Sequence, residues 1–468
     1  MSLDTSSTTE PYLTGIYEPV TDEREDVGLT VMGEIPQALR GSYLRNGSNP
    51  QFSPLGRYHV FDGDGMIHAV DVADGQATYR NRWVDSRGLL VERREGQALY
   101  GGLSEFVLPA PEVTAEGGIV KNTANTNIIR HAGRRLALME AAAPTELRAD
   151  LSTVGEFTFD DRLDGPMTAH PRIDPATGAM HFFGWSPFAP YLRYHVVDAN
   201  GALVHSTVIE LERSVMIHDF VITESSVVFF DLPAVFDVER MMSGHGGTHW
   251  RGDLPARIGV MPLGGDGAQI RWIEIDPCYV FHFVNAHDTA DGRIVVDGCR
   301  ASAMPTSFGD DPMPGPEVKP SLHRWLIDPV EGDAVLTQLD DRGADFPRIN
   351  DAYTGRDQRW SYLGHVGSWN DEEVIFDGVT VFDRAGNTWV DHVYGTHHAS
   401  GEAVFAADPN GSAENDGWLL NFVTDLTDRS SRLVILDAHD VTKGPVAEVL
   451  LPRRVPSGFH GNWLSEPA

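Results

Sequence analysis

Four histidines that stand in short apolar stretches could together bind a metal ion: His170, His218, His282 and His460. Imidazole nitrogen is a suitable ligand for iron, zinc, copper and nickel. A histidine buried in apolar, strand-like sequence needs a hydrogen-bonding or metal partner, and each of the four has such a setting. Together they indicate a metal centre assembled from distant parts of the chain.

The alternative is that these four are ordinary core residues. The chain has 19 histidines, and a buried imidazole is often bonded only to a backbone carbonyl. The gaps of 48, 64 and 178 residues match no compact metal motif. They do fit a radial propeller, in which one side chain from each of several blades can reach the central axis.

Composition is that of a folded globular protein. Of 468 residues, 41% are hydrophobic and 22% charged, and 47 glycines and 29 prolines divide the chain into short segments. The formal charge of −32 argues against a nucleic-acid surface, which would be basic. No stretch approaches 18 uninterrupted apolar residues, so no spanning helix is expected.

The N-terminal sequence carries no basic segment followed by an apolar one, so no secretory signal is predicted. Residues 1–10 are rich in Ser and Thr and are expected to form a disordered leader, with residues 11–468 as a single domain. Cys278 and Cys299 are too few for a disulfide framework, although one bridge between them stays open. This cysteine usage favours a reducing, cytoplasmic location.

Turn signals between short apolar runs predict β-hairpins over most of the chain. One hairpin is centred on Asp74-Gly75, and the run Tyr58–Phe61 before it is expected to be a strand. Further hairpins are predicted over residues 173–183, 194–204, 284–296 and 379–389. The pattern favours an all-β propeller of seven or eight blades, with two tandem β-sandwiches as the second choice.

Seven short motifs, in this order, resemble the carotenoid cleavage oxygenase family. They are Gly41–Gly47, Phe61–Met66, Asn122–Asn127, Ala169–Pro171, Ile217–Phe220, Phe281-His282 and Gly458–Gly461. The resemblance implies a seven-bladed β-propeller with a dome of loops and short helices over one face. It also implies a non-haem Fe(II) ion held by His170, His218, His282 and His460, and oxidative cleavage of a C=C bond by O2 to two carbonyl products.

The resemblance further assigns carboxylates that accept the outer N–H of the histidine rings. Glu140 and Glu402 match two family glutamates, and Asp345 stands at a third. Because aspartate is one methylene shorter, its ring contact is expected to need a water or a shifted backbone. Thr126 matches a threonine whose methyl leans over an open iron position, although it also suits a turn in an Asn/Thr-rich loop.

Two substrate classes are compatible with the resemblance. The motifs around His460 and Glu140 look like the carotenoid and apocarotenoid branch, whereas Tyr100 and Lys121 keep a stilbene or phenylpropanoid branch open. Leu103 stands where a phenol-binding tyrosine would be, which counts against stilbenes. With Phe61, these residues form the expected substrate pocket.

Two further expectations concern partners. A hydrophobic conjugated alkene is the expected substrate, and peripheral contact with a membrane for its uptake is compatible with the sequence. A non-enzymatic alternative is a propeller that serves as a binding platform, with the histidines holding a structural metal or none. Bound iron would favour the oxygenase over this platform.

Overall fold

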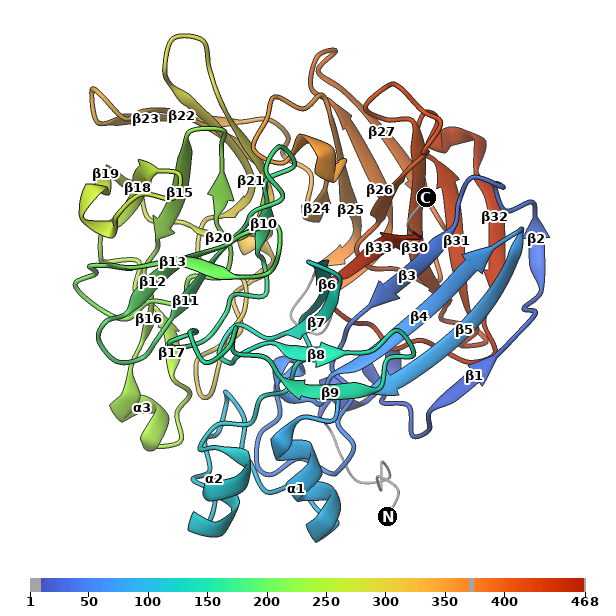
Figure 1. Ribbon diagram of the computed structural model, residues 1–468, viewed down its shortest axis with the longest axis horizontal. Helices are drawn as coiled ribbons and strands as arrows, with labels where there is room; N and C mark the ends of the chain where they lie inside the picture. Colours follow the sequence, from blue (N-terminus) through green and yellow to red (C-terminus); the bar gives the residue numbers. More distant parts are fainter. Residues whose placement is uncertain (1–9, 370–373, 467–468) are drawn as a thin grey trace.

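Seven of the eight sheets are arranged as the blades of a propeller, in a computed structural model that describes residues 10–369 and 374–466 (Figure 1). The predicted all-β, seven-bladed class is therefore confirmed, and the tandem sandwiches are wrong. Written from outer to inner strand, the first blade is β1 (Arg24–Asp26), β5 (Gln76–Trp83), β4 (Met66–Ala73), β3 (Gly41–Arg45) and β33 (Gly461–Ser465). The second blade is β9 (Thr153–Glu156), β8 (Thr145–Leu147), β7 (Arg134–Leu138) and β6 (Asn127–His131), and the third is β13 (Leu203–Ile209), β12 (Leu192–Val197), β11 (Met180–Trp185) and β10 (Arg172–Ile173). The fourth blade is β19 (Arg271–Ile275), β18 (Ala256–Pro262), β15 (Ser226–Asp231) and β14 (Val221–Ile222). The other three are β23 (Asp333–Gln338), β22 (Ser321–Asp328), β21 (Ile294–Ala301) and β20 (Tyr279–Asp288); β27 (Thr388–Val393), β26 (Val374–Asp383), β25 (Trp360–Trp369) and β24 (Ala344–Arg348); β2 (Val31–Gly33), β32 (Pro445–Leu450), β31 (Ser431–Asp437) and β30 (Gly417–Asp425), followed by β28 (His398–Ala399) and β29 (Val404–Ala407), which both pair with β30.

The ring is closed by strands from opposite ends of the chain. β33 pairs antiparallel with β3, so the last strand becomes the innermost strand of the first blade (Figure 1). In the last blade, β2 pairs with β32 at the outer edge. Two separate pairings therefore join early and late segments and close the ring of blades.

Hairpin turns arise where the sequence supplies residues that tolerate positive φ. Asp74 and Gly75, at φ 52° and 73°, link β4 to β5, as expected for a two-residue Asp-Gly turn. The other four predicted hairpins are also present as β10–β11, β12–β13, β20–β21 and β26–β27. The strand predicted at Tyr58–Phe61 is wrong: a 3₁₀ turn (Val60–Asp62) forms there, because the His59 and Asp62 side chains cap it reciprocally.

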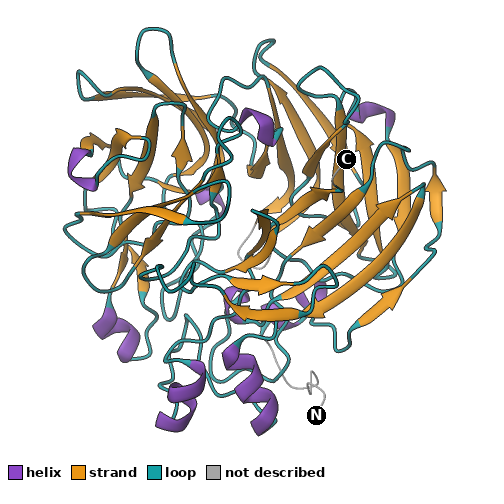
Figure 2. Cartoon of the chain, in the orientation of Figure 1, coloured by secondary structure: helices purple, strands orange, loops and turns teal. Residues whose placement is uncertain are grey.

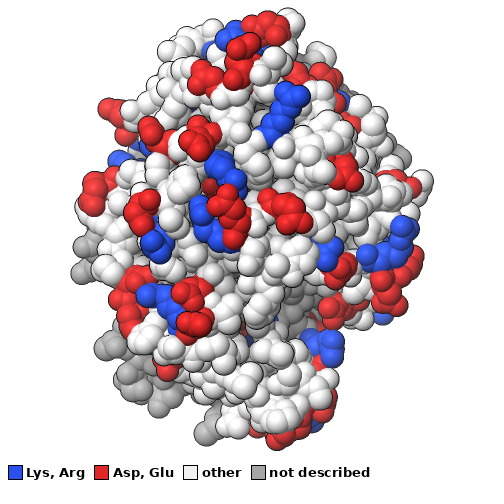
Figure 3. All heavy atoms as spheres, turned by 90° about the vertical axis from the view of Figure 1, so that its left-hand side faces the viewer, with Lys and Arg blue, Asp and Glu red and all other residues white. Residues whose placement is uncertain are grey.

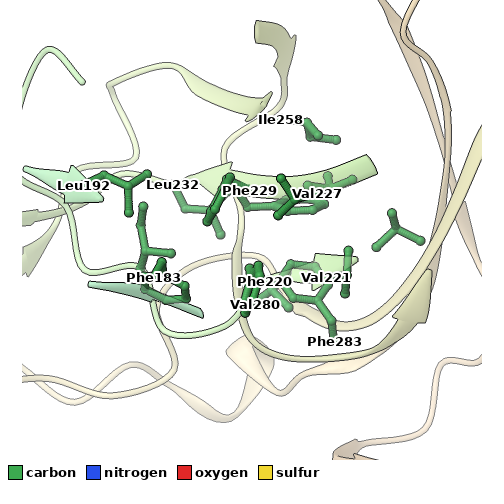
Figure 4. Close-up of a cluster of buried hydrophobic side chains, with 14 of the residues drawn as sticks. Phe183, Leu192, Phe220, Val221, Val227, Phe229, Leu232, Ile258, Val280 and Phe283 are labelled. Carbon is green, nitrogen blue, oxygen red and sulfur yellow. The ribbon is translucent and has the colours of Figure 1, made fainter. Parts of the chain in front are cut away.

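Blades pack face to face, so their inner and middle strands are buried on both sides. The largest apolar cluster lies between the blades of β11, β15 and β20 and includes Phe183, Phe220, Phe229 and Phe283 (Figure 4). Each fully buried side chain of this size stabilises the fold by about 1.5–3 kcal/mol. The outer strand β23 is mostly exposed, in keeping with its place at the rim.

The α-helices are few and short, and they lie along the lower edge of the view in Figure 1, whereas the short helical turns in Figure 2 are spread around the ring. The α-helices are α1 (Arg87–Glu95), α2 (Pro111–Gly117) and α3 (Val238–Met242), the last carried by the hairpin of β16 (Ala234–Phe236) and β17 (Thr248–Trp250). Ser86 caps α1 at its start and Gly96, in the left-handed conformation, ends it. The 3₁₀ turns are η1 (Pro11–Leu13), η2 (Gly15–Tyr17), η3 (Val60–Asp62), η4 (Gly267–Gln269), η5 (Pro316–Val318), η6 (Asp351–Tyr353) and η7 (Val441–Lys443).

Acidic and basic side chains are interspersed on the surface, as the face in Figure 3 shows. Within the described part of the chain, no helix has the length and apolar character needed to cross a membrane. Cys278 and Cys299 are both buried and free, so the bridge left open by the sequence does not form. The leader expected at residues 1–10 lies, apart from Glu10, outside the described residues.

Candidate metal centre

Four blades each direct one histidine to the propeller axis. His170, His218 and His460 lie one to three positions before the inner strands β10, β14 and β33, and His282 lies within β20. The Nε2 atoms of His170 and His218 are 3.0 Å apart, those of His218 and His282 are 3.3 Å apart, and those of His282 and His460 are 3.2 Å apart. All four ligand atoms lie within 4.8 Å of one another. The structure thus brings together all four histidines predicted from the sequence.

This spacing suits a single metal ion. Nitrogens bound at right angles on an ion with bonds of about 2.1 Å would be about 3 Å apart. Three of the rings face a carboxylate with Nδ1, which places their proton there and leaves the Nε2 lone pair directed inward. Converging lone pairs repel one another unless a cation lies between them, so the donor set fits a bound metal ion.

Three further blades supply the carboxylates. Glu140 Oε2 lies 3.1 Å from His218 Nδ1, Asp345 Oδ1 lies 2.7 Å from His282 Nδ1, and Glu402 Oε1 lies 3.1 Å from His460 Nδ1. The residues come from the β7–β8 connection, from β24 and from the segment before β29. Every blade therefore contributes one residue, either a histidine or the carboxylate that orients a histidine.

Asp345 reaches its histidine directly, without the water considered from its shorter side chain. The register of β24 against β25 shifts between Asp345 and Arg348, and Phe346 has φ 50° in this bulge. A left-handed φ at a phenylalanine costs on the order of 1–3 kcal/mol, which the surroundings must offset. The bulge sets the Phe346 ring against His282, at a centroid distance of 5.3 Å. A bulged backbone thus accompanies the direct contact.

Glu402 is the most heavily bonded of the carboxylates. Besides His460, it accepts a hydrogen bond from the Gly461 N–H and pairs with Arg348, at 3.0 and 3.3 Å. Burial acts to raise its pKa, but the Arg348 guanidinium and His460 outweigh burial and lower the pKa to about 2. Glu402 is therefore charged at neutral pH.

Arg348 was not predicted, although it follows Asp345 by only three positions in the same strand. Its guanidinium also donates to the carbonyl of Gly461 and to the side chain of Asn462, both at 2.9 Å. It thereby fixes the strand that follows His460. The signal in the sequence that could have identified Arg348 is a basic residue in the same predicted strand as the carboxylate Asp345.

The imidazoles differ in their electrostatic environment. Burial, and next the neighbouring histidines, hold the pKa of His170 well below its ordinary value. For His282, burial acts to lower the pKa, but the Asp345 carboxylate outweighs it and raises the pKa. Among the described residues His170 has no carboxylate partner, and the Thr168 hydroxyl accepts from the backbone N–H of His170 at 3.1 Å, which fixes the backbone of this residue rather than its ring.

Apolar rings and a threonine lie close to the histidines. Phe281 packs edge-on against His218, at a centroid distance of 4.9 Å. Thr126 contacts the histidine set through its backbone, since its carbonyl accepts from the His460 N–H at 3.1 Å. Its hydroxyl donates to Asn125, which agrees with the turn role considered from the sequence.

A cavity of ≈ 420 Å³ with mixed polar and apolar walls opens onto His170, His282 and His460 from one side. Its walls include Arg172 and Asp219, which follow His170 and His218 in the chain, and Arg348, which follows Asp345 in β24. Arg172 donates to both oxygens of Asp219, at 2.8 and 2.7 Å. Three of the histidines are therefore reached from this cavity, whereas Phe281 packs on the remaining one, His218.

Of the four predicted pocket residues, Phe61 contacts a neighbour of the histidines. Its ring packs edge-on against Phe459 at 5.4 Å. Tyr100 instead packs with Val91 and Val113 beneath α1 and α2, and Leu103 is 41% exposed.

Lys121 is not a free cation in a substrate site. Its ammonium is buried and pairs with Asp64 and Glu92, each at 2.5 Å. Burial acts to lower the pKa of Lys121, but the two carboxylates outweigh burial and raise it. The interpretation of Lys121 as a phenol-binding group stays a prediction, and the structure shows its ammonium paired with two carboxylates.

We expect Lys121→Met to lower the free energy of unfolding by about 3–5 kcal/mol, because it leaves two buried carboxylates without their cation. Thermal or urea unfolding would measure the loss. Lys443→Met, at a lysine whose side chain is 70% exposed, is the matched control and should change stability little. Equal stability of the two variants would contradict a structural role for Lys121.

Comparisons with known proteins agree with this geometry. The family model described as retinal pigment epithelial membrane protein matches residues 17–465. The chain is 35% identical to a carotenoid cleavage oxygenase of Mycobacterium tuberculosis, over 97% of each chain, and 32% identical to an isoeugenol monooxygenase of Pseudomonas nitroreducens, over 98% of each. The structure of Pseudomonas brassicacearum lignostilbene dioxygenase superposes with a TM-score of 0.90 at 30% identity, covering 98% of this chain and 99% of that one. This chain, with its four-histidine metal site, is a member of the carotenoid cleavage oxygenase family, whose enzymes use O2.

Proposed function

We propose that the protein is a non-haem Fe(II) dioxygenase that cleaves a C=C bond of a carotenoid or apocarotenoid to two carbonyl products. The observation that carries the metal assignment is the set of four Nε2 atoms with carboxylates behind three of the rings. Four neutral nitrogens leave positions free on a six-coordinate ion such as iron, whereas zinc is commonly filled by four ligands. Family membership argues against the binding platform considered from the sequence.

Iron, when bound, would supply the activation of O2. In this proposal, His170, His218, His282 and His460 hold the ion through Nε2. Glu140, Asp345 and Glu402 accept the Nδ1 protons and so fix the tautomers and ring orientations before substrate arrives.

The apolar rings around the centre support a hydrocarbon substrate. Phe281 lies against His218, and Phe61 lies against Phe459, the residue before His460. A conjugated chain offers little to hydrogen-bond and gains about 25 cal/mol per Å² of apolar area buried. Asp64 and Glu92 both engage Lys121, the lysine that a phenol was expected to use, and this favours the hydrocarbon substrate.

A phenolic alkene is the second candidate. It is favoured by the TM-score of 0.90 to a lignostilbene dioxygenase and by the likeness to an isoeugenol monooxygenase. A site built for a phenol would need a buried polar partner for the hydroxyl, and would lose heavily if that partner were removed.

Product analysis of the iron-loaded protein tests both candidates. The protein should be given a long apocarotenal, a 4-hydroxystilbene and isoeugenol under ¹⁸O₂, with products identified by mass spectrometry. We expect cleavage of the apocarotenal with label in both carbonyl products. Cleavage of only the phenolic substrates would support the second candidate, and label in one product alone would contradict a dioxygenase.

The proposal includes a cytoplasmic location, which the free thiols of Cys278 and Cys299 support. Fractionation of the native host would test it. Recovery in an oxidising compartment would contradict it.

A further inference from the structure

Arg45 is a buried cation that lacks a carboxylate partner among the described residues. It is the last residue of β3 and is 4% exposed. One guanidinium nitrogen, Nη2, donates to the carbonyl of Pro456, and its Nε has no hydrogen-bond partner. A buried guanidinium without a counter-charge is costly, and in a chain of net charge −32 such isolation calls for an explanation.

Glu402 follows Gly401, whose position lies close to Arg45 Nη1, but its carboxylate is already engaged. Glu402 pairs with Arg348 and His460. Burial lowers the pKa of Arg45 to about 10, and the only groups that act against burial are the hydroxyls of Tyr43 and Tyr79. Arg453 and Arg454 add positive charge nearby, since both, like Arg45, act to lower the pKa of the buried His68.

A small cavity adjoins this guanidinium. Its volume is ≈ 10 Å³, about what one solvent-sized particle requires. It is lined by Ile16, Arg45, Ala399, Ser400, Phe422, Thr424, Val455 and Ser457. No carboxylate is part of this lining, and Arg45 is its only charged residue, so the cavity is small, positive and partly apolar.

We propose that this cavity is a binding site for one small monovalent anion of the halide class, held by the Arg45 guanidinium. A single-atom anion matches both the room available and the missing negative charge, because it neutralises the buried cation without needing further donors in a fixed geometry. Ser457 lines the same cavity and carries a hydroxyl, a second group of the donor type that an anion requires.

The site is coupled to the metal centre through the segment that carries His460. A Cβ added at Gly458 would lie only 2.9 Å from Cζ and Nε of Arg45, so the guanidinium packs directly on this segment. Asn46, next to Arg45, donates its N–H to the carbonyl of His460 at 2.9 Å and accepts from the Phe459 N–H at 2.9 Å. An anion that fixes Arg45 therefore also steadies the position of His460.

Bromide provides a direct test, because it replaces chloride and scatters X-rays anomalously. Crystals of the iron-loaded protein grown with bromide at physiological halide concentration should show an anomalous peak beside Arg45 Nε. A water or empty density there would overturn the proposal. So would a peak seen only at molar bromide, which would be an adventitious ion only.

Metal retention provides an independent readout. With chloride replaced by gluconate at equal ionic strength, we expect iron to be lost to a chelator about tenfold faster, the lower end of effects seen for groups that orient a metal ligand. In Arg45→Met the halide dependence should vanish, whereas Arg148→Met, at an exposed arginine, should keep it. Halide dependence that persists in Arg45→Met would contradict the site.

A second variant guards against misfolding of Arg45→Met. Ala399→Val keeps the guanidinium but fills part of the cavity, since Ala399 lines it and is 7% exposed. We expect this variant to fold and to lose both the bromide peak and the halide dependence of iron release. Retention of the peak in Ala399→Val would place the ion elsewhere and overturn the assignment.

Discussion

His218→Ala is expected to abolish iron binding and oxygenase activity together while leaving the propeller folded. His218 occupies the middle of the set, with its Nε2 3.0 Å from that of His170 and 3.3 Å from that of His282. Its removal leaves three donors and an unpaired Glu140 carboxylate. The blade packing does not depend on this ring, because the adjacent core consists of Phe220, Phe229 and their neighbours.

Elemental analysis, oxygen uptake and circular dichroism of the purified variant would measure the three parts of this expectation. His205→Ala is the matched control, because His205 is only partly buried and bonds a backbone carbonyl, that of Gly265, at 3.0 Å. The control should retain iron and turnover. A His218→Ala protein that kept both would show that this histidine is not a ligand.

The second large effect is expected from replacing the carboxylates. Glu402→Gln and Asp345→Asn should weaken iron retention more than Glu140→Gln does. Loss of a group that orients a metal ligand typically weakens metal retention or activity by about 10–100-fold. Glu402 also binds the Gly461 N–H and Arg348, and Asp345 makes the shortest ring contact, at 2.7 Å. The Glu140 side chain is 15% exposed, so water can replace part of its interaction.

Dissociation rates of iron in the presence of a chelator would rank the three variants. Each substitution preserves side-chain shape, so a change in melting temperature much larger than that of Glu105→Gln, a surface control, would indicate structural damage instead. The order differs from the one expected from side-chain length, by which Asp345 would matter least. If Asp345→Asn were the mildest variant, the direct 2.7 Å contact would not be functionally important.

Local sequence was sufficient where local chemistry decides the structure. Asp-Gly and Asn-Gly pairs predicted hairpins because positive φ is needed there and few other residues adopt it. The four histidines were predictable because apolar settings made their burial, and hence their need for partners, visible.

The sequence could not show contacts between residues that lie far apart along the chain. Lys121 looked available because its partners Asp64 and Glu92 are far away in the sequence, and only the fold brings them to its ammonium. The reach of Asp345 could not be judged from its length, since it depends on the bulge at Phe346, for which Pro347 was the local signal because proline inside a sheet is confined to edges and bulges. Arg45 gave no sign in the sequence that it would be buried without a carboxylate.

The pairing of β33 with β3 has a consequence for biosynthesis. His460 follows every strand of the other six blades, so a nascent chain on the ribosome displays three of the histidines well before the fourth is made. Iron captured at that stage would be held incompletely and exchanged easily. We therefore expect iron to be inserted after translation. A cell short of iron should accumulate folded protein with a closed propeller ring and no metal, rather than partly folded intermediates.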